Sequence, residues 1–267
     1  MLFADAFDHV VNSTEWELLE TQGLGFQLPF GLSKFVILEL LAAGLILAIF
    51  IPLARAARSG EPPRGVLWNM FEVLLTFIRD RVAKPTLGEH GADHYVPFLW
   101  TVFLFILFCN LLGLVPFLGS PTASLAVTAA LAICAFAAIH VSAMVEKGPW
   151  NYLKAHYPHI DAPMGLGPPI ALFIVFIELL GHFIKAFVLA VRLFANLFAG
   201  HLVLAFILTF IVLARNTPIY LFAPITLGSV FMVTALSLLE LFIAFLQAYI
   251  FTFLTALFMG MALHAHH

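Results

Sequence analysis

Five polar residues lie along one face of the most apolar part of the chain: Glu178, His182, Lys185, Arg192 and Asn196. Their successive spacings of four, three, seven and four residues place them on one side of an α-helix, which has 3.6 residues per turn. Charged side chains inside an apolar span are costly and mark ion pathways or substrate sites. Arg192 is the first candidate, because arginine keeps its charge and needs an anion or water nearby.

A structural ion pair of Arg192 with Glu178 or Glu240 is the simplest alternative. Glu178 lies roughly 20 Å away along the same helix, which is too far for a direct pair. An anion supplied by another chain therefore explains this cation better. Glu178, His182 and Lys185 can instead form a local, self-neutralising cluster, because residues three and four apart on a helix are neighbours.

A second polar stripe follows in the next apolar run, at Thr234, Ser237, Glu240 and Gln247. His201 lies nine residues after Arg192 and so points to the opposite side of its helix. If the two helices pack antiparallel, His201 and Glu240 become neighbours. A carboxylate beside an imidazole can relay protons.

Histidines in the apolar runs, at positions 140, 182 and 201, leave a haem-binding electron-transfer subunit as a weaker alternative. Nothing in their spacing fixes a pair at matched depth on facing helices. We expect no metal and no other cofactor. No nucleotide-binding loop occurs, so any ATP chemistry is expected to lie outside this chain, and we expect no catalytic chemistry in the chain itself.

The elements that carry these residues must be membrane helices. Of the 267 residues, 63% are hydrophobic and 10% are charged, which excludes an ordinary soluble domain. Runs of about 20 nearly uncharged residues match the thickness of a bilayer, and they lack the alternation of barrel strands. We predict an all-α integral membrane protein of one domain with about five crossings, at residues 34–54, 97–118, 122–145, 168–214 and 218–263.

Charge sets the expected orientation. The first 33 residues are acidic, whereas Arg55, Arg58 and Arg64 follow the first span, so the tail is expected outside and the C-terminus inside. Residues 64–84 repeat apolar side chains every three or four positions and predict an amphipathic helix at the inner surface or against another subunit. No basic patch suggests nucleic acid as a partner.

The last two predicted helices are too long for upright crossings. Residues 168–214 would extend roughly 70 Å, against a hydrocarbon core of about 30 Å. Two consecutive overlong helices predict a strongly tilted hairpin.

The segment from Leu189 to His201, LAVRLFANLFAGH, resembles the signature of subunit a of the F-type ATP synthases, including that family's essential arginine. Glu178 and Lys185 before it, Glu240 and the Gln247-Ala248-Tyr249-Ile250-Phe251 stretch after it, and the Asn110–Pro116 turn also resemble this family. One departure lies at Ser124 and Ala126, where many bacterial members have Asp and Asn. The resemblance covers nearly the whole chain.

What the resemblance implies is a stator beside a ring of c subunits, with Arg192 facing the ring carboxylates and blocking proton leak. An outer half channel would involve His201, Glu240 and Asn196, an inner one Glu178 and His182, and Gln247 would help to hold Arg192. The implied partners are the c-ring, subunit b with the peripheral stalk, the rest of the synthase, lipid and protons. The implied location is a bacterial plasma membrane, with the mitochondrial inner membrane as the alternative.

A stand-alone secondary transporter of an anionic substrate is the competing function, with Arg192 binding the anion and the polar stripes lining its cavity. Neither an inverted repeat nor an interrupted helix pair is visible in the sequence.

Overall fold

The computed structural model describes residues 34–58, 65–115, 120–148, 150, 167–215 and 218–264. The predicted N-terminal tail, residues 1–33, is not among them. Contacts between Cα atoms divide the chain into two compact units. Unit 1 comprises residues 1–63, 104–128 and 192–249, and unit 2 comprises residues 64–103, 129–191 and 250–267.

The all-α fold class is confirmed, because no strand occurs among the described residues. The elements are α2 (Lys34–Arg58), α3 (Val66–Ile78), the π-helix η3 (Arg79–Ala83), α4 (Lys84–Gly113), the 3-10 helix η4 (Pro121–Ala123), α5 (Leu125–Lys147), α7 (Gly167–Ala214) and α8 (Ile219–His264). Five of these helices are long and apolar enough to cross a membrane within the described part of the chain. They contain the segments Lys34–Ala56, Gly91–Gly113, Leu125–Lys147, Phe183–Ala214 and Ile219–Leu263.

Helices α7 and α8 begin and end within one residue of the predicted bounds, and each is a single helix, of 48 and 46 residues respectively. A charge-poor run with few breakers predicts such helices directly. At the turn between them the Arg215 N–H donates to the Val212 carbonyl, and the Leu221 N–H donates to that of Pro218. The steep tilt of this hairpin in a bilayer stays a prediction.

Before α5, the helix boundaries in the structure differ from the predicted ones. Instead of one amphipathic helix over 64–84, α3 continues through η3 into α4 without a loop. The break falls at Gly88, whose φ of 73° is a conformation that glycine adopts easily. Pro97, the predicted start of a span, lies inside α4, where its fixed φ is compatible with the helix although its nitrogen donates no hydrogen bond.

The next predicted pair of boundaries also differs. Helix α4 ends at Gly113, before the expected residue 118, and α5 starts at Leu125, after the expected residue 122. Between them η4 forms a tight turn, in which the Ser124 N–H donates to the Pro121 carbonyl at 3.0 Å.

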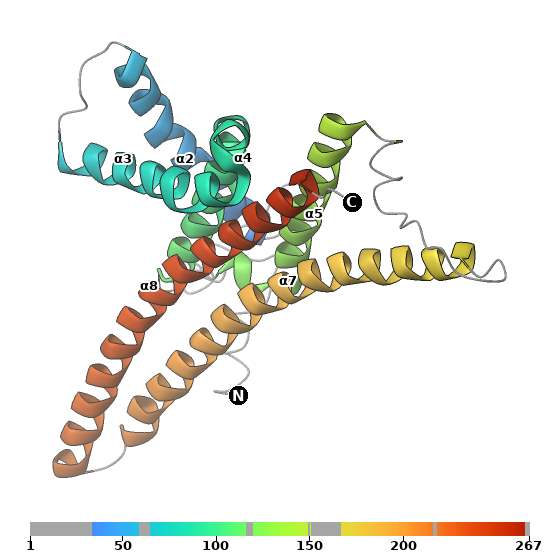
Figure 1. Ribbon diagram of the computed structural model, residues 1–267. Coiled ribbons are helices and arrows are strands. Elements are labelled where there is room, and N and C mark those ends of the chain that lie inside the picture. Colours follow the sequence, from blue (N-terminus) through green and yellow to red (C-terminus); the bar gives the residue numbers. More distant parts are fainter. Residues whose placement is uncertain are drawn as a thin grey trace. The chain divides into compact units, whose positions relative to one another are not determined.

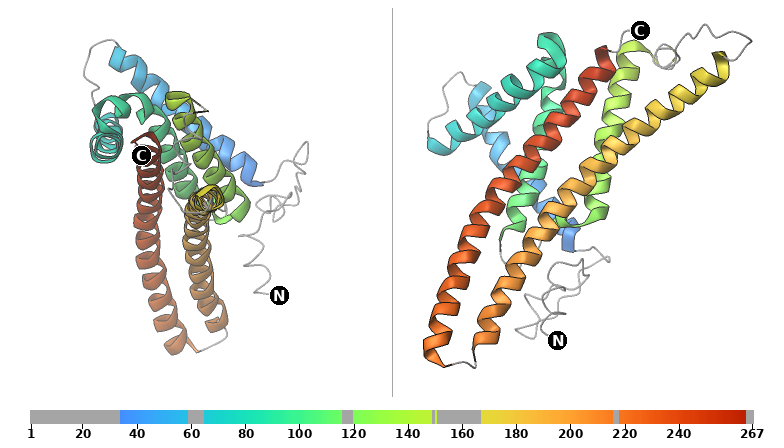
Figure 2. Two further views of the ribbon diagram at one scale, coloured as in Figure 1. Left: turned by 45° about the vertical axis from the view of Figure 1, so that its right-hand side comes forward. Right: turned by 60° about the horizontal axis from the view of Figure 1, so that its bottom comes forward.

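Unit 1 contains α2, the C-terminal part of α4, η4, and the parts of α7 and α8 nearest their connection. In this unit the two long helices run antiparallel and side by side (Figures 1 and 2). Buried residues of this unit include Leu38 and Ile106, both at 0% exposure, and Leu193, at 1% exposure. Most of the apolar surface of the hairpin is nevertheless exposed, as on Phe206, Phe231 and Phe242.

Unit 2 contains α3, η3, the first part of α4, most of α5 and the remaining ends of α7 and α8. Its core includes the fully buried Ile78, Val82 and Leu99. The Trp100 Nε1–H donates to the Leu75 carbonyl at 2.8 Å and so fastens α4 to α3. The Lys147 ammonium donates to the Ala262 carbonyl at 3.0 Å, which joins the end of α5 to the end of α8.

Candidate functional site

Arg192 is exposed on α7, within the segment that is apolar enough to cross a membrane. Among the described residues, no hydrogen bond or ion pair involves its guanidinium. The suggested structural pair with Glu240 is therefore absent, although both side chains are described. A fixed cation at this place has room for an anion that comes from outside the chain.

Glu240 of α8 is buried, with 8% of its surface exposed, and it lies against the backbone of α7. A Cβ atom built on Gly200 would overlap Oε1 of this carboxylate and lie 3.3 Å from its Cγ. Gly200 immediately precedes His201, so the hairpin brings the expected histidine and acid to the same level. The sequence predicts Glu240 beside His201 but does not identify Gly200, the residue whose backbone the carboxylate approaches.

One nitrogen atom and one oxygen atom of these two side chains are buried without a hydrogen-bond partner among the described residues. They are Nε2 of His201 and Oε2 of Glu240. Buried polar groups are normally satisfied by protein or by ordered water. Each of these two atoms therefore keeps hydrogen-bonding capacity that no described residue uses.

The other predicted residues of unit 1 lie on both sides of this contact along the hairpin. Asn196 is exposed on α7, whereas Gln247 of α8 is buried, with 4% exposure. Ser237 and Thr234 are exposed, and the Thr234 hydroxyl donates to the Val230 carbonyl of its own helix. The second polar stripe is therefore divided into a buried part, Glu240 with Gln247, and an exposed part.

Glu178 and His182 lie on α7, but their side chains are outside the described part of the structure. Their proposed cluster with Lys185 therefore stays a prediction. The Lys185 ammonium lies 5.0 Å from the centre of the Phe258 ring, which is cation–π geometry.

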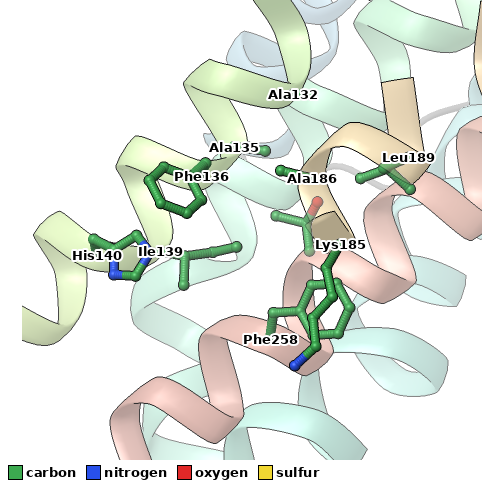
Figure 3. A pocket seen from close by; sticks show the side chains of 10 residues that line it. Ala132, Ala135, Phe136, Ile139, His140, Lys185, Ala186, Leu189 and Phe258 are labelled. Atoms are coloured by element: carbon green, nitrogen blue, oxygen red, sulfur yellow. The ribbon is translucent and has the colours of Figure 1, made fainter. Parts of the chain in front are cut away.

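A small cavity of unit 2 adjoins Lys185 (Figure 3). Its lining comes from α5, α7 and α8, and apart from Lys185, His140 and Thr255 it is apolar. The His140 ring packs edge-on against Phe136, with 4.2 Å between the ring centres. Within the described residues, no group of three His, Cys, Asp or Glu side chains is arranged to hold a metal ion.

Sequence reasoning missed a buried polar network in unit 1. Asn110 of α4 is fully buried, and its amide donates to the Ala244 carbonyl of α8 at 3.0 Å. Thr122 and Ser120 continue the network. The sequence contained a signal, because Asn110 is a polar residue within an apolar span, but from the sequence alone we interpret the Asn110–Pro116 stretch as a turn.

A second missed residue is Glu39, a carboxylate inside the span of α2. It is half-buried and lies within electrostatic range of Cys109, the neighbour of Asn110. An ionisable residue within a span is a candidate functional residue by default.

The chain is similar to one family of known proteins. The family model described as "ATP synthase A chain" matches residues 36–260. The chain is 42% identical over 258 residues to ATP synthase subunit a of Anaeromyxobacter dehalogenans (strain 2CP-C), covering 95% of this chain and 64% of that relative. It is 40% identical over 240 residues to ATP synthase subunit a of Myxococcus xanthus, covering 90% and 75%.

A third relative, ATP synthase subunit a of Chloroherpeton thalassium, is 38% identical over 276 residues, covering 98% of this chain and 78% of the relative. The chain thus spans between about two thirds and four fifths of the length of these relatives. The matches give no support to the alternative of a stand-alone carrier.

Proposed function

Because the chain belongs to the ATP synthase A chain family, we propose that it is the stator subunit of the membrane sector of a rotary ATP synthase. In this role it provides two offset proton half channels and couples proton flow to ATP synthesis. The observation that carries the proposal is Arg192, an exposed guanidinium in an apolar helix with no anionic partner among the described residues.

The exposed guanidinium is suited to a carboxylate that moves past it. A carboxyl group on a ring of c subunits is neutral while it faces lipid, because an ionised one there would cost several kcal/mol, on the order of 3 or more. Near Arg192 the anion is stabilised, so the carboxyl group releases its proton. It takes up another proton once the ring has carried it past the arginine.

Arg192 also separates the two half channels. A fixed positive charge repels protons, so protons cannot run directly from one half channel to the other and must travel on the ring. The offset between the half channels then gives the rotation its direction.

We assign His201, Glu240 and Asn196 to the outer half channel. The support is the buried contact of Glu240 with Gly200 and the orphaned atoms of Glu240 and His201, which favour a hydrated proton path. A carboxyl group and an imidazole can each take up a proton and release it again.

We assign Glu178 and His182 to the inner half channel and Gln247 to a supporting position beside Arg192. These assignments rest on the spacing along α7 and α8. Along α7, Glu178 lies about four turns before Arg192, whereas His201 lies after Arg192. Glu178 and Glu240 are therefore expected at different depths in the membrane.

The proposed surroundings follow from the same role. The partners are the c-ring, subunit b with the peripheral stalk, and the rest of the synthase. The chain is a multi-pass membrane protein, and the exposed apolar surface of the α7–α8 hairpin fits both lipid and a ring of apolar helices. We place it in a bacterial plasma membrane with the N-terminus outside and the C-terminus inside, following the positive-inside rule.

The test replaces Arg192 with alanine in the complete synthase. Coupled ATP synthesis should be lost while the complex still assembles with its c-ring. Arg215→Ala is the matched control, because Arg215 is also exposed but lies just after the end of α7. Retained synthesis in Arg192→Ala would reject the proposed function.

A further inference from the structure

A chain of buried hydrogen bonds connects three helical elements of unit 1. The Asn110 amide of α4 donates to the Ala244 carbonyl of α8 at 3.0 Å, and the Thr122 hydroxyl of η4 donates to Oδ1 of Asn110 at 2.8 Å. The Ser120 hydroxyl lies 2.9 Å from that of Thr122. We call Asn110, Thr122 and Ser120 the polar clamp.

The direction of every hydrogen bond in the polar clamp follows from the proton inventory. Thr122 has one hydroxyl proton, which it donates to Asn110, so Ser120 must donate to Thr122. The chain thus runs from Ser120 to a backbone carbonyl and ends there. An amide does not exchange its protons readily at neutral pH, so the clamp is suited to holding α8 rather than to passing protons.

Because the polar clamp is buried, it resists movement of α8 relative to α4. Asn110 and Thr122 are 0% exposed and Ser120 is 3% exposed. If α8 moved along or about its axis, the Asn110 amide would lose its acceptor in an environment where water does not replace it. A buried donor left without a partner costs more than the bond itself contributes.

The end of α4 and Ser120 also approach each other closely. A Cβ atom built on Gly113 would lie 3.1 Å from Cα of Ser120 and would collide with its side chain. Glycine at the end of α4 therefore lets Ser120 return against α4. This return brings Thr122 within reach of Asn110.

The Ala244 carbonyl, which accepts the hydrogen bond from Asn110, lies between two residues of the proposed mechanism. Ala244 is about one helical turn after Glu240 and a little less than one turn before Gln247. On α7, Gly200 contacts the Glu240 carboxylate. The Glu240 carboxylate therefore lies against Gly200 of α7. The hydrogen bond from Asn110 of α4 fixes the position of α8.

We propose that Asn110 is a positioning residue, which through Thr122 and Ser120 fixes the register of α8 and so holds Glu240 against Gly200 at the correct depth. This inference rests on the proposed function. It adds a set of uncharged residues, outside the two long helices, on which the outer half channel depends.

The experiment measures proton flux through the complete synthase in membrane vesicles as a function of pH. Asn110→Leu removes the amide at similar volume, and Thr122→Val removes one hydroxyl without changing the shape. Thr128→Val is the matched control, because Thr128 is also 0% exposed but its hydroxyl donates to the carbonyls of Ser124 and Leu125, within four residues of it in the sequence. Each variant is also combined with Glu240→Gln.

We expect Asn110→Leu to lower flux by about tenfold to a hundredfold, the scale on which a small misplacement of a reacting group acts. Its pH profile should change, because the surroundings of Glu240 change. The other titratable or charged groups in the membrane-crossing segments of this unit are Lys34, Glu39 and Arg55 of α2, Cys109 of α4, Arg192 and His201 of α7, and Tyr220 and Tyr249 of α8. Thr122→Val should act in the same direction, and Thr128→Val should leave the profile unchanged.

Combination with Glu240→Gln separates positioning from general stability. If the clamp acts through Glu240, Asn110→Leu should have little further effect in the Glu240→Gln background. An unchanged pH profile in the single variants, or effects that add fully to that of Glu240→Gln, would overturn the clamp while leaving the proposed function in place.

The same variants and the unmutated complex also cover two further outcomes. Should Asn110→Leu fail to assemble, the milder Thr122→Val against Thr128→Val decides the question. Absence of proton flux in the assembled, unmutated complex would overturn the proposed function and the clamp with it.

Discussion

Gly200 of α7 lies directly against the carboxylate of Glu240 of α8, where a Cβ atom on residue 200 would be 3.1 Å from the carboxyl carbon and would overlap Oε1. The lack of a side chain at Gly200 lets a buried acid reach the backbone beside His201. The proposed outer half channel depends on this close approach.

Gly200→Ala should therefore displace the carboxylate and slow proton flux, by about tenfold or more if the acid moves by as little as 1 Å. The measurement is proton flux into membrane vesicles that contain the assembled synthase. Gly228→Ala serves as the control, because a Cβ atom there would meet nothing within 4 Å. Equal flux in both variants and the unmutated complex would show that the contact is irrelevant to the path.

Glu240→Gln tests the charge of the same group while keeping its shape. Glutamine cannot release a proton, so proton flux should fall and its dependence on pH should change. Glu72→Gln, on the exposed face of α3, should leave flux unchanged. Normal flux at every pH in Glu240→Gln would remove this acid from the path.

The long helices could be predicted because their signal is local. Charge-poor runs define α7 and α8, and the turn at Pro218 separates them, so the predicted bounds agree with the structure within one residue. Helical spacing and antiparallel packing of consecutive helices predict that His201 and Glu240 are neighbours, and the structure places Gly200, the residue before His201, against Glu240.

The region around α4 could not be predicted in the same way. Its features depend on backbone geometry, such as the φ of 73° at Gly88, which a single glycine in the sequence does not specify. The acceptor of the Asn110 amide is a backbone carbonyl 134 residues away, and every residue type has such a carbonyl. A polar residue in an apolar span indicates that a partner exists, but not which one.

Gly260 provides a prediction about stability in unit 2. A Cβ atom on Gly260 would overlap the Thr86 carbonyl oxygen and lie 3.1 Å from its carbon. Because a backbone group cannot turn aside as a flexible side chain can, Gly260→Ala should destabilise the protein by about 1–3 kcal/mol, as overpacking does. Thermal unfolding of the purified complex measures the effect.

The control for Gly260 is Gly91→Ala, where the nearest atom is Cβ of Leu87 at 3.4 Å, an ordinary contact. Its unfolding temperature should stay close to that of the unmutated protein. A Gly260→Ala protein as stable as the Gly91→Ala protein would mean that α8 does not approach α4 so closely.

Asp80 gives a prediction about pH outside the membrane spans. A hydrogen bond from the Lys84 ammonium, 2.7 Å from Oδ1, holds the pKa of Asp80 below its usual value. The resulting stabilisation is complete above the pKa of an unfolded Asp and is lost as the pH falls through the folded pKa. Lys84→Gln should raise the pKa of Asp80, which the titration of its carboxyl ¹³C signal would show.

Thermal stability at neutral pH should hardly change in Lys84→Gln, because 41% and 43% of the two side chains are exposed and such surface pairs contribute little. Arg55→Gln, on another helix, should leave the Asp80 titration as it was. The assigned cause of the low pKa would be wrong if Lys84→Gln also left it unchanged.

The last prediction concerns leakage past Arg192. If its fixed charge is what keeps protons from passing directly between the half channels, Arg192→Ala should let them pass even when the ring cannot turn. The measurement is passive proton flux, driven by an imposed membrane potential, with the ring cross-linked to the stator. Arg192→Lys keeps a cation and should leak less than Arg192→Ala, because lysine retains the repulsion while losing the planar group that binds a carboxylate through two bonds. Arg192→Ala membranes as tight as the unmutated ones would show that another feature of the chain separates the half channels.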